Sequence, residues 1–214
     1  ADFISEFAQG RIHHAHLITG PKGIGKATLA YRLARHILNS GAQTSSADAE
    51  EAPSFSLFGD EPAPAKPAPT ISAAMDADSP IFKRIMAGSH SDLLTLSPAF
   101  DAKKNVEKNL ITVEEARQVP EFMSLTPAEG LWRVVIIDAV DQLNNQAANA
   151  LLKILEEPPA RAILFLICHQ PRAILPTIRS RCRQLKLNAP DDAAFSEILG
   201  SIAPSIETHE YAAL

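Results

Sequence analysis

The chain has 214 residues, of which 46% are hydrophobic and 21% charged, as in an ordinary globular protein with one sizeable core. Its formal net charge of -5 argues against a protein that simply coats nucleic acid, and no apolar run approaches the roughly 20 residues of a membrane-spanning helix. Because there are only two cysteines, Cys168 and Cys182, and no signal peptide at the start, we exclude a disulfide framework and expect a protein of the reducing cytoplasm.

The first strong signal is a strand, a glycine-rich loop and a helix in succession. Residues 15–19 are a short apolar segment, and the helix that follows the loop carries Leu29, Leu33, Ile37 and Leu38 on one face. In a phosphate-binding loop, backbone N–H groups surround a phosphate at a helix N-terminus, and a lysine neutralises its charge. The alternative is a glycine-rich turn that carries a lysine by chance. We predict a nucleotide site at Gly20, Pro21, Lys22, Gly23, Ile24, Gly25, Lys26, Ala27 and Thr28.

The partners of this loop are incomplete. The eighth loop position, where a hydroxyl normally ligates magnesium, is Ala27, and Thr28 comes one place late, rotated about 100° around the helix. Asp138 ends a buried strand and is the expected magnesium acid, with helix capping as the alternative role. Ala139 stands where related ATPases place the glutamate that polarises water, and Asp141 would need an unusual backbone path to replace it. The nucleotide site is therefore predicted to be vestigial, or to bind nucleotide without turnover.

Residues 42–80 differ from the rest of the chain in composition. They are rich in Ala, Ser and Pro, and they carry seven acidic residues against Lys66, whereas the remainder is near neutral. Such a segment cannot bury enough apolar surface to offset the entropy of ordering it. We predict a disordered insertion at 42–80.

Four further apolar segments predict strands at 92–96, 133–138, 162–168 and 184–187. Thr112 and Glu115 have the spacing of a capping box, which predicts a helix over 113–122, and a second helix is expected over 145–156, before Pro158-Pro159. This alternation predicts an α/β fold with a five-stranded parallel sheet and helices on both faces. Residues 189–214 are expected to begin a small helical lid.

Two later segments carry a specific resemblance. Residues 149–159 read Asn-Ala-Leu-Leu-Lys-Ile-Leu-Glu-Glu-Pro-Pro, and residues 175–182 read Leu-Pro-Thr-Ile-Arg-Ser-Arg-Cys. With the phosphate loop, Asp138, and the stretches at 13–16 and 89–92, they make most of the chain similar to the AAA+ clamp-loader subunits of bacterial DNA polymerase III. The resemblance implies an AAA+ P-loop domain over 1–188, followed by the start of the lid at 189–214, with the rest of the lid and the C-terminal collar absent.

In that family, motor subunits hydrolyse ATP, whereas delta-prime-type subunits are stators that lend an arginine to a neighbour. Because Ala27 and Ala139 replace the hydroxyl and the glutamate of a motor, the resemblance implies a delta-prime-type stator without ATPase activity. It also implies that Arg181 is an arginine finger, acting on ATP held by the adjacent motor while the sliding clamp is loaded in DNA replication. The implied partners are motor and delta-type subunits and, through the polymerase assembly, the clamp and primed DNA.

The cofactor expectations follow from the same resemblance. The family's cysteine-based zinc module is replaced here by the cysteine-free segment 42–80, so we expect no zinc. No cofactor is required by a stator, and binding of ATP or ADP stays open. Cys168 occupies the nucleotide-sensing position, where a motor would carry a hydroxyl or an amide.

Three alternatives stay open. The first is an active clamp-loader ATPase in which Lys26, Thr28, Asp138 and Asp141 act through altered geometry. The second is a phosphate-loop kinase, which would leave the two later motifs unexplained. In the third the protein is a scaffold, and Arg181 forms only a surface or helix-end ion pair. The histidines at 13–16 are interpreted as packing rather than metal ligands, and the adjacent acids at 156–157 as a solvated pair at a helix end.

Overall fold

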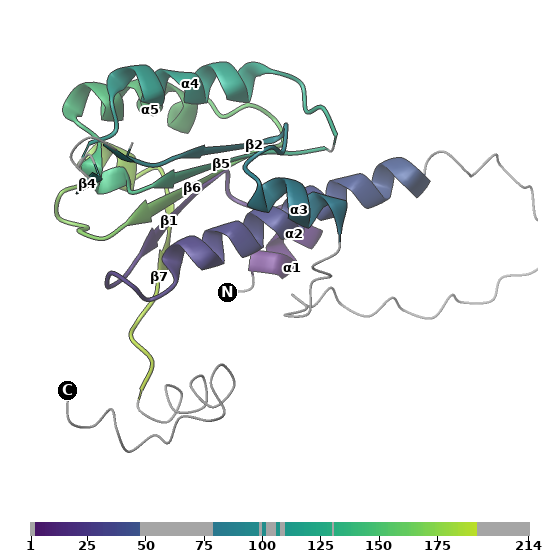
Figure 1. Ribbon diagram of the computed structural model, residues 1–214, viewed down its shortest axis with the longest axis horizontal. Helices are drawn as coiled ribbons and strands as arrows, with labels where there is room; N and C mark the ends of the chain where they lie inside the picture. The colour runs from purple at the N-terminus through teal and green to yellow at the C-terminus, as the bar shows by residue number, and fades with distance from the viewer. Residues whose placement is uncertain are drawn as a thin grey trace, which may run out of the picture.

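The computed structural model describes residues 3–47, 79–98, 100–101, 106–107, 110–129 and 131–191. Its centre is a five-stranded parallel sheet in the order β2-β5-β6-β1-β7 (Figure 1). The strands are β1 (Ala15–Thr19), β2 (Leu93–Leu96), β5 (Arg133–Asp138), β6 (Ala162–Cys168) and β7 (Arg183–Lys186). The predicted α/β fold with a five-stranded parallel sheet is confirmed.

The strands are apolar on both faces because helices cover both sides of the sheet. Alternate residues along each strand enter two separate cores. One core joins Leu17, Val135 and Leu164 to α4 (Val113–Ser124), α5 (Asn145–Glu156) and α6 (Pro176–Arg179). The other joins Ile18, Ile136 and Phe165 to α1 (Phe3–Ala8), α2 (Lys26–Ala47) and α3 (Pro80–Met86), and Figure 1 shows these helices on the opposite side of the sheet from α4 and α5.

The two helices with clear sequence signals begin where expected. Thr112 caps α4 through the predicted capping box, in which its hydroxyl accepts from the Glu115 backbone N–H and the Glu115 carboxylate accepts from the Thr112 N–H. Asn144 caps α5 by accepting from the Ala147 N–H at 2.7 Å. Both helices then pack on the sheet through their apolar faces. The cap that starts each helix and the face that it buries are therefore consistent with the same helical segment.

The structure also contains elements that the sequence patterns did not predict. These are α1, α3, α6, the 3-10 helix η1 (Val140–Gln142), and the short antiparallel pair β3 (Phe100–Asp101) and β4 (Val106–Glu107). Helix α2 continues to Ala47 and α3 begins at Pro80, so both reach into the predicted insertion at 42–80. Residues 48–78 and 192–214 lie outside the described residues, and the insertion and the lid stay predictions.

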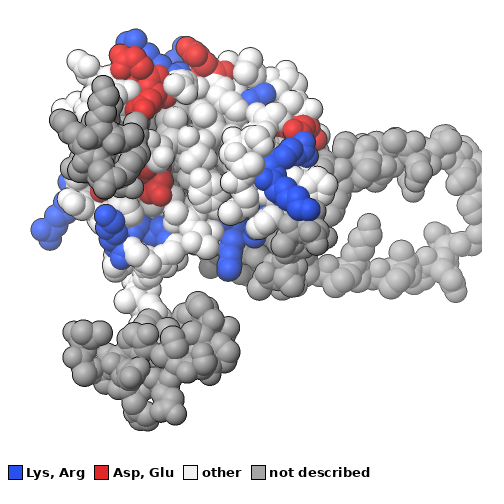
Figure 2. Space-filling view, in the orientation of Figure 1, with Lys and Arg blue, Asp and Glu red and all other residues white. Residues whose placement is uncertain are grey.

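The surface is mixed in charge. Figure 2 shows acidic and basic side chains scattered around one face, with uncharged residues over its middle. In the described part of the chain, no helix is long and apolar enough to cross a membrane.

Candidate functional site

The phosphate loop joins the carboxyl end of β1 to the start of α2. This edge of a parallel sheet is where α/β folds bind their ligands. Lys26, the first residue of α2, is only 3% exposed, and its ammonium donates to the carbonyls of Gly20 at 2.9 Å and Pro21 at 2.6 Å. Burial lowers the Lys26 pKa, against the opposing effect of Asp138, Cys168 and Asp141. The lysine therefore braces its own loop, and a bound phosphate would have to draw the ammonium away from these carbonyls.

Two glycines give the loop its shape. Gly25 has a φ of 88°, in the left-handed region that glycine adopts without strain. A Cβ atom on Gly20 would lie 2.6 Å from the carbonyl oxygen of Leu187, beyond the end of β7. The loop is thus packed against the segment that follows β7. A hollow of about 290 Å³ lies at this junction, lined by loop residues together with His169 and Lys186.

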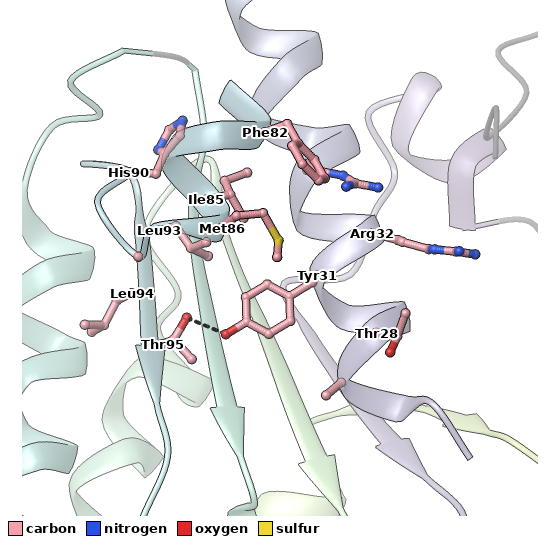
Figure 3. Close-up of a pocket in the computed structure, with 13 residues that line it drawn as sticks. Thr28, Tyr31, Arg32, Phe82, Ile85, Met86, His90, Leu93, Leu94 and Thr95 are labelled. Atoms are coloured by element: carbon pink, nitrogen blue, oxygen red, sulfur yellow. Dashed lines mark hydrogen bonds between the residues drawn. The ribbon is translucent and has the colours of Figure 1, made fainter. Parts of the chain in front are cut away.

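The residues at the helix start lie beside a second, larger hollow. Ala27 and Thr28 line a cavity of about 1000 Å³ between α2, α3 and β2 (Figure 3). In the same cavity the Tyr31 hydroxyl donates to Thr95 at 3.4 Å, and the Met86 side chain lies at the mouth. Thr28 therefore lines this cavity, together with Ala27, rather than the hollow beside the loop at β7.

The acids at the end of β5 have different roles. An oxygen of Asp138 lies 3.7 Å from Nε2 of His169, an ion pair if that ring is protonated. The carboxylate of Asp141 accepts from the backbone N–H groups of His169 at 3.0 Å and Gln170 at 3.1 Å. Ala139 is 2% exposed, so the position of the missing glutamate is closed by packing. Asp141 thus ties the loop after β6 to η1, which argues against its use as a general base.

Cysteine chemistry contributes little here. Cys168 is fully buried at the end of β6, and burial, followed by the nearby Asp141, raises the pKa of its thiol to about 12. Burial likewise raises the pKa of Cys182 to about 12. Both thiols are therefore protonated at neutral pH. In the described ranges, no group of three or more His, Cys, Asp and Glu side chains is placed to hold a metal ion.

The Ser-Arg-Cys tripeptide lies between α6 and β7. The Ser180 hydroxyl donates to the Thr177 carbonyl at 3.1 Å, and the Cys182 side chain packs against the core under α5 and α6. These two neighbours fix the backbone on either side of Arg181, whose side chain stays 35% exposed. Its guanidinium donates through Nη1 to the Thr177 carbonyl at 2.9 Å. The tripeptide therefore presents one cation at the surface on a rigid base.

The Arg181 side chain also contacts Glu156, a residue to which no functional role was assigned from the sequence. Nη2 of Arg181 lies 2.7 Å from a carboxylate oxygen of Glu156, the last residue of α5. Glu156 was interpreted as half of a solvated pair at a helix end. It is exposed there, and its ion pair with Arg181 is the part that was not predicted. The only available signal was that an acid is unfavourable at a helix C-terminus. The ion pair also matches the scaffold alternative, in which Arg181 is paired at a helix end.

The structure thus separates the predicted site residues into two places. The phosphate loop, Lys26 and Asp138 lie together at the carboxyl edge of the sheet, as the motif predicted. Arg181 follows α6, and its side chain contacts Thr177, Ser180 and Glu156, none of which belongs to the loop. Among the described residues, the side-chain contacts of Arg181 thus lie apart from the phosphate loop.

Comparison with known proteins gives consistent matches. The sequence model of the family described as "DNA polymerase III, delta subunit" matches residues 69–191. A Pseudomonas aeruginosa protein named DNA polymerase III subunit delta' is 34% identical over 197 residues, which are 91% of this chain and 50% of that protein. Subunit delta' of Escherichia coli K12 is 31% identical, over 88% of this chain and 46% of that protein. Subunit tau of the same organism is 30% identical, over 85% of this chain and 23% of that protein.

A solved structure supports the fold. The chain is similar to a DNA polymerase III, gamma subunit-related protein from Thermotoga maritima, with a TM-score of 0.58 and 20% sequence identity, over 94% of this chain and 50% of that chain. At this identity the likeness shows the fold alone, a P-loop α/β fold. The chain spans about half the length of the delta' relatives that it matches.

Proposed function

Since this chain belongs to the DNA polymerase III delta subunit family and is a clamp-loader subunit, we propose that it is a delta-prime-type stator without ATPase activity of its own. In this proposal the chain lends Arg181 to ATP bound by a neighbouring motor subunit. It assembles with motor and delta-type subunits, and acts through them on the sliding clamp and primed DNA during replication.

The observation that carries the proposal is the state of the chain's own nucleotide site. Hydrolysis needs a magnesium ligand and a group that polarises the attacking water. Ala27 and Ala139 supply neither, the latter is buried, and the carboxylate of Asp141 is already held by two backbone N–H groups. With Lys26 directed at its own loop carbonyls, this site retains the shape of a phosphate loop but lacks the groups for turnover.

The role of Arg181 is supported by its exposure and chemistry. Arginine is permanently charged and offers five N–H donors in a planar arrangement that fits phosphate oxygens. A partly exposed guanidinium on a packed backbone can reach across a subunit interface and stabilise charge that develops on a transferred phosphoryl group. An arginine finger of this kind is typically worth about 10³-fold or more in kcat.

A second candidate function is an active clamp-loader ATPase. The observation that favours it is the intact loop, in which Gly20, Gly23, Gly25 and Lys26 are all present at the motif spacing, with Asp138 at the same edge of the sheet. Several relatives of this chain are named subunit tau or gamma rather than delta'. In this alternative Thr28 and Asp141 would replace the missing magnesium ligand and base.

Nucleotide binding and turnover by the purified chain separate the two candidates. Radiolabelled ATP and ADP are titrated, and phosphate release is followed, with Lys26→Ala as the matched control. We expect no phosphate release above the Lys26→Ala background, whether or not nucleotide binds. Turnover that disappears in Lys26→Ala would contradict the stator and make the chain a motor.

A further inference from the structure

Glu156 lies where helix electrostatics disfavour an acid. It is the last residue of α5, next to the partial negative charge of the helix C-terminus, and Glu157 follows it as the cap. An acid at this end of a helix is unfavourable, because its charge has the same sign as the end of the helix dipole. The end of α5 is itself held in place, because Nε2 of His14 is hydrogen bonded to the Leu155 carbonyl at 3.0 Å. An acid kept at a fixed but unfavourable position needs a compensating partner, and for Glu156 this partner is Arg181.

The two main contacts of Arg181 use only some of its N–H donors. Nη1 donates to the Thr177 carbonyl at 2.9 Å, and Nη2 to Glu156 at 2.7 Å, from different segments of the chain. A guanidinium has five N–H donors, two on each Nη and one on Nε. The two contacts, with a longer one of 3.4 Å to the Ser180 hydroxyl, leave donors for an external anion. The guanidinium is thus held in one orientation while some of its N–H donors stay available.

We infer that Glu156 is a positioning residue for Arg181: it holds the guanidinium in the orientation in which the remaining donors meet a phosphate of the neighbouring subunit. This inference rests on the proposed function of Arg181. The carboxylate touches neither nucleotide nor reacting atoms, and it acts only through the arginine. By limiting the rotamers of a long side chain before the subunits meet, it removes part of the entropy that would otherwise be lost in the transition state.

The strength of the ion pair limits the size of the effect. The Glu156 side chain is 50% exposed and that of Arg181 35%, so solvent screens their attraction. An exposed ion pair affects a reaction rate only by favouring one rotamer of the arginine side chain. The energy of such a pair corresponds to about a two- to fivefold change in rate. We therefore expect the loss of Glu156 to lower kcat by that factor, well below the effect of losing Arg181 itself.

The test uses the full-length subunit reconstituted with its motor and delta-type partners. ATP turnover is measured at the site that this subunit adjoins, with the other motor sites inactivated at their own phosphate-loop lysines. The variants are Glu156→Ala, Glu156→Gln, Arg181→Ala and the double variant with Glu156→Ala and Arg181→Ala. Glu157→Ala is the matched control, since it removes the same charge from the same helix end and Glu157 is exposed beside the pair.

We expect Glu156→Ala to lower kcat two- to fivefold with an unchanged KM for ATP, and Glu157→Ala to have no effect. Glu156→Gln, which keeps the acceptor oxygen without the charge, should fall between wild type and Glu156→Ala. In the Arg181→Ala background, Glu156→Ala should have no further effect, because a positioning residue has nothing left to position. Thermal unfolding of all single variants should stay close to wild type.

Three results would overturn the inference while leaving the function of Arg181 intact. These are equal rates for Glu156→Ala and Glu157→Ala, an increase in kcat for Glu156→Ala, and an equal loss in kcat with and without Arg181. If Arg181→Ala itself leaves turnover unchanged, the proposed function fails and the inference fails with it. The two failures are therefore distinguishable in one set of measurements.

Discussion

The buried carboxylate of Asp92 gives the sharpest prediction about stability. Asp92 is completely buried at the start of β2, and its two oxygens accept from the backbone N–H groups of Ala128 at 2.7 Å and Glu129 at 2.8 Å. Nη2 of Arg133 lies 3.7 Å away, and that side chain is 6% exposed. Arg133 also donates to the Thr126 carbonyl. Asp92 therefore joins the loop before β5 to the edge of the sheet and is the acidic partner of a buried cation.

Replacing Asp92 by alanine removes both carboxylate hydrogen bonds and the ion pair with Arg133 at once. Breaking a buried ion pair by deleting one partner typically costs about 3–5 kcal/mol, because the other charge stays buried without compensation. A domain of this size has about 5–15 kcal/mol of total stability. We therefore expect Asp92→Ala to lose about a fifth or more of it, and to lower the midpoint of thermal unfolding by roughly 6–20 °C.

Urea unfolding followed by circular dichroism measures this free energy. Ser91→Ala is the control, because it removes only an exposed hydroxyl that donates to Glu129, and it should change the free energy of unfolding by less than about 0.5 kcal/mol. The double variant Asp92→Leu with Arg133→Met should recover part of the loss, because it removes both charges. A loss below about 1 kcal/mol for Asp92→Ala, or no recovery in the double variant, would refute the reasoning.

Three further predictions concern the core and the titratable groups. Leu151→Ala should cost about 2–5 kcal/mol in urea unfolding, because Leu151 is fully buried on the core-facing side of α5, whereas the exposed Lys153→Ala should be near neutral. Burial, with the nearby charge of His13 as a smaller cause, lowers the pKa of His16 to about 4, so the unfolded chain binds more protons than the folded one between pH 6.5 and 4. The contribution of His16 to the free energy of unfolding should therefore be fully present above pH 6.5 and fall by about 3 kcal/mol as the pH drops to 4. In urea titrations at each pH, His16→Phe should flatten this decline. Cys182 in the folded chain should react with iodoacetamide at pH 8 far more slowly than in urea, as mass spectrometry would show, because burial holds its thiol protonated; equal rates would contradict this.

The parts of the fold that were predictable are those with long, uniform signals. The apolar runs of β1, β5 and β6 were assigned with the bounds that the structure has, because strands buried on both faces are mostly apolar along their whole length. The strand predicted at 184–187 is shifted by one residue, since β7 at the sheet edge alternates between half-buried and exposed side chains. The two-residue strands β3 and β4 carry no periodicity at all, which is why they were missed.

The site was predictable in its motifs but not in its contacts. Spacing identified the phosphate loop and the Ser-Arg-Cys tripeptide, because both depend on short local sequences. It could not show that Lys26 turns to its own loop carbonyls, or that Asp141 is used by the backbone after β6. Nor could it pair Glu156 with Arg181, because their contact depends on how α5 and α6 pack against each other.

The most direct test of the account compares two variants in the reconstituted clamp loader. Lys26→Ala disables this chain's own phosphate loop, and Arg181→Ala removes the arginine offered to the neighbour. With the other motor sites inactivated, single-turnover hydrolysis is measured at the site that this subunit adjoins. If the chain is a stator, the loader with Lys26→Ala hydrolyses ATP like wild type, while the loader with Arg181→Ala loses about 10³-fold in rate. The opposite pattern, loss with Lys26→Ala and wild-type hydrolysis with Arg181→Ala, would contradict the stator role.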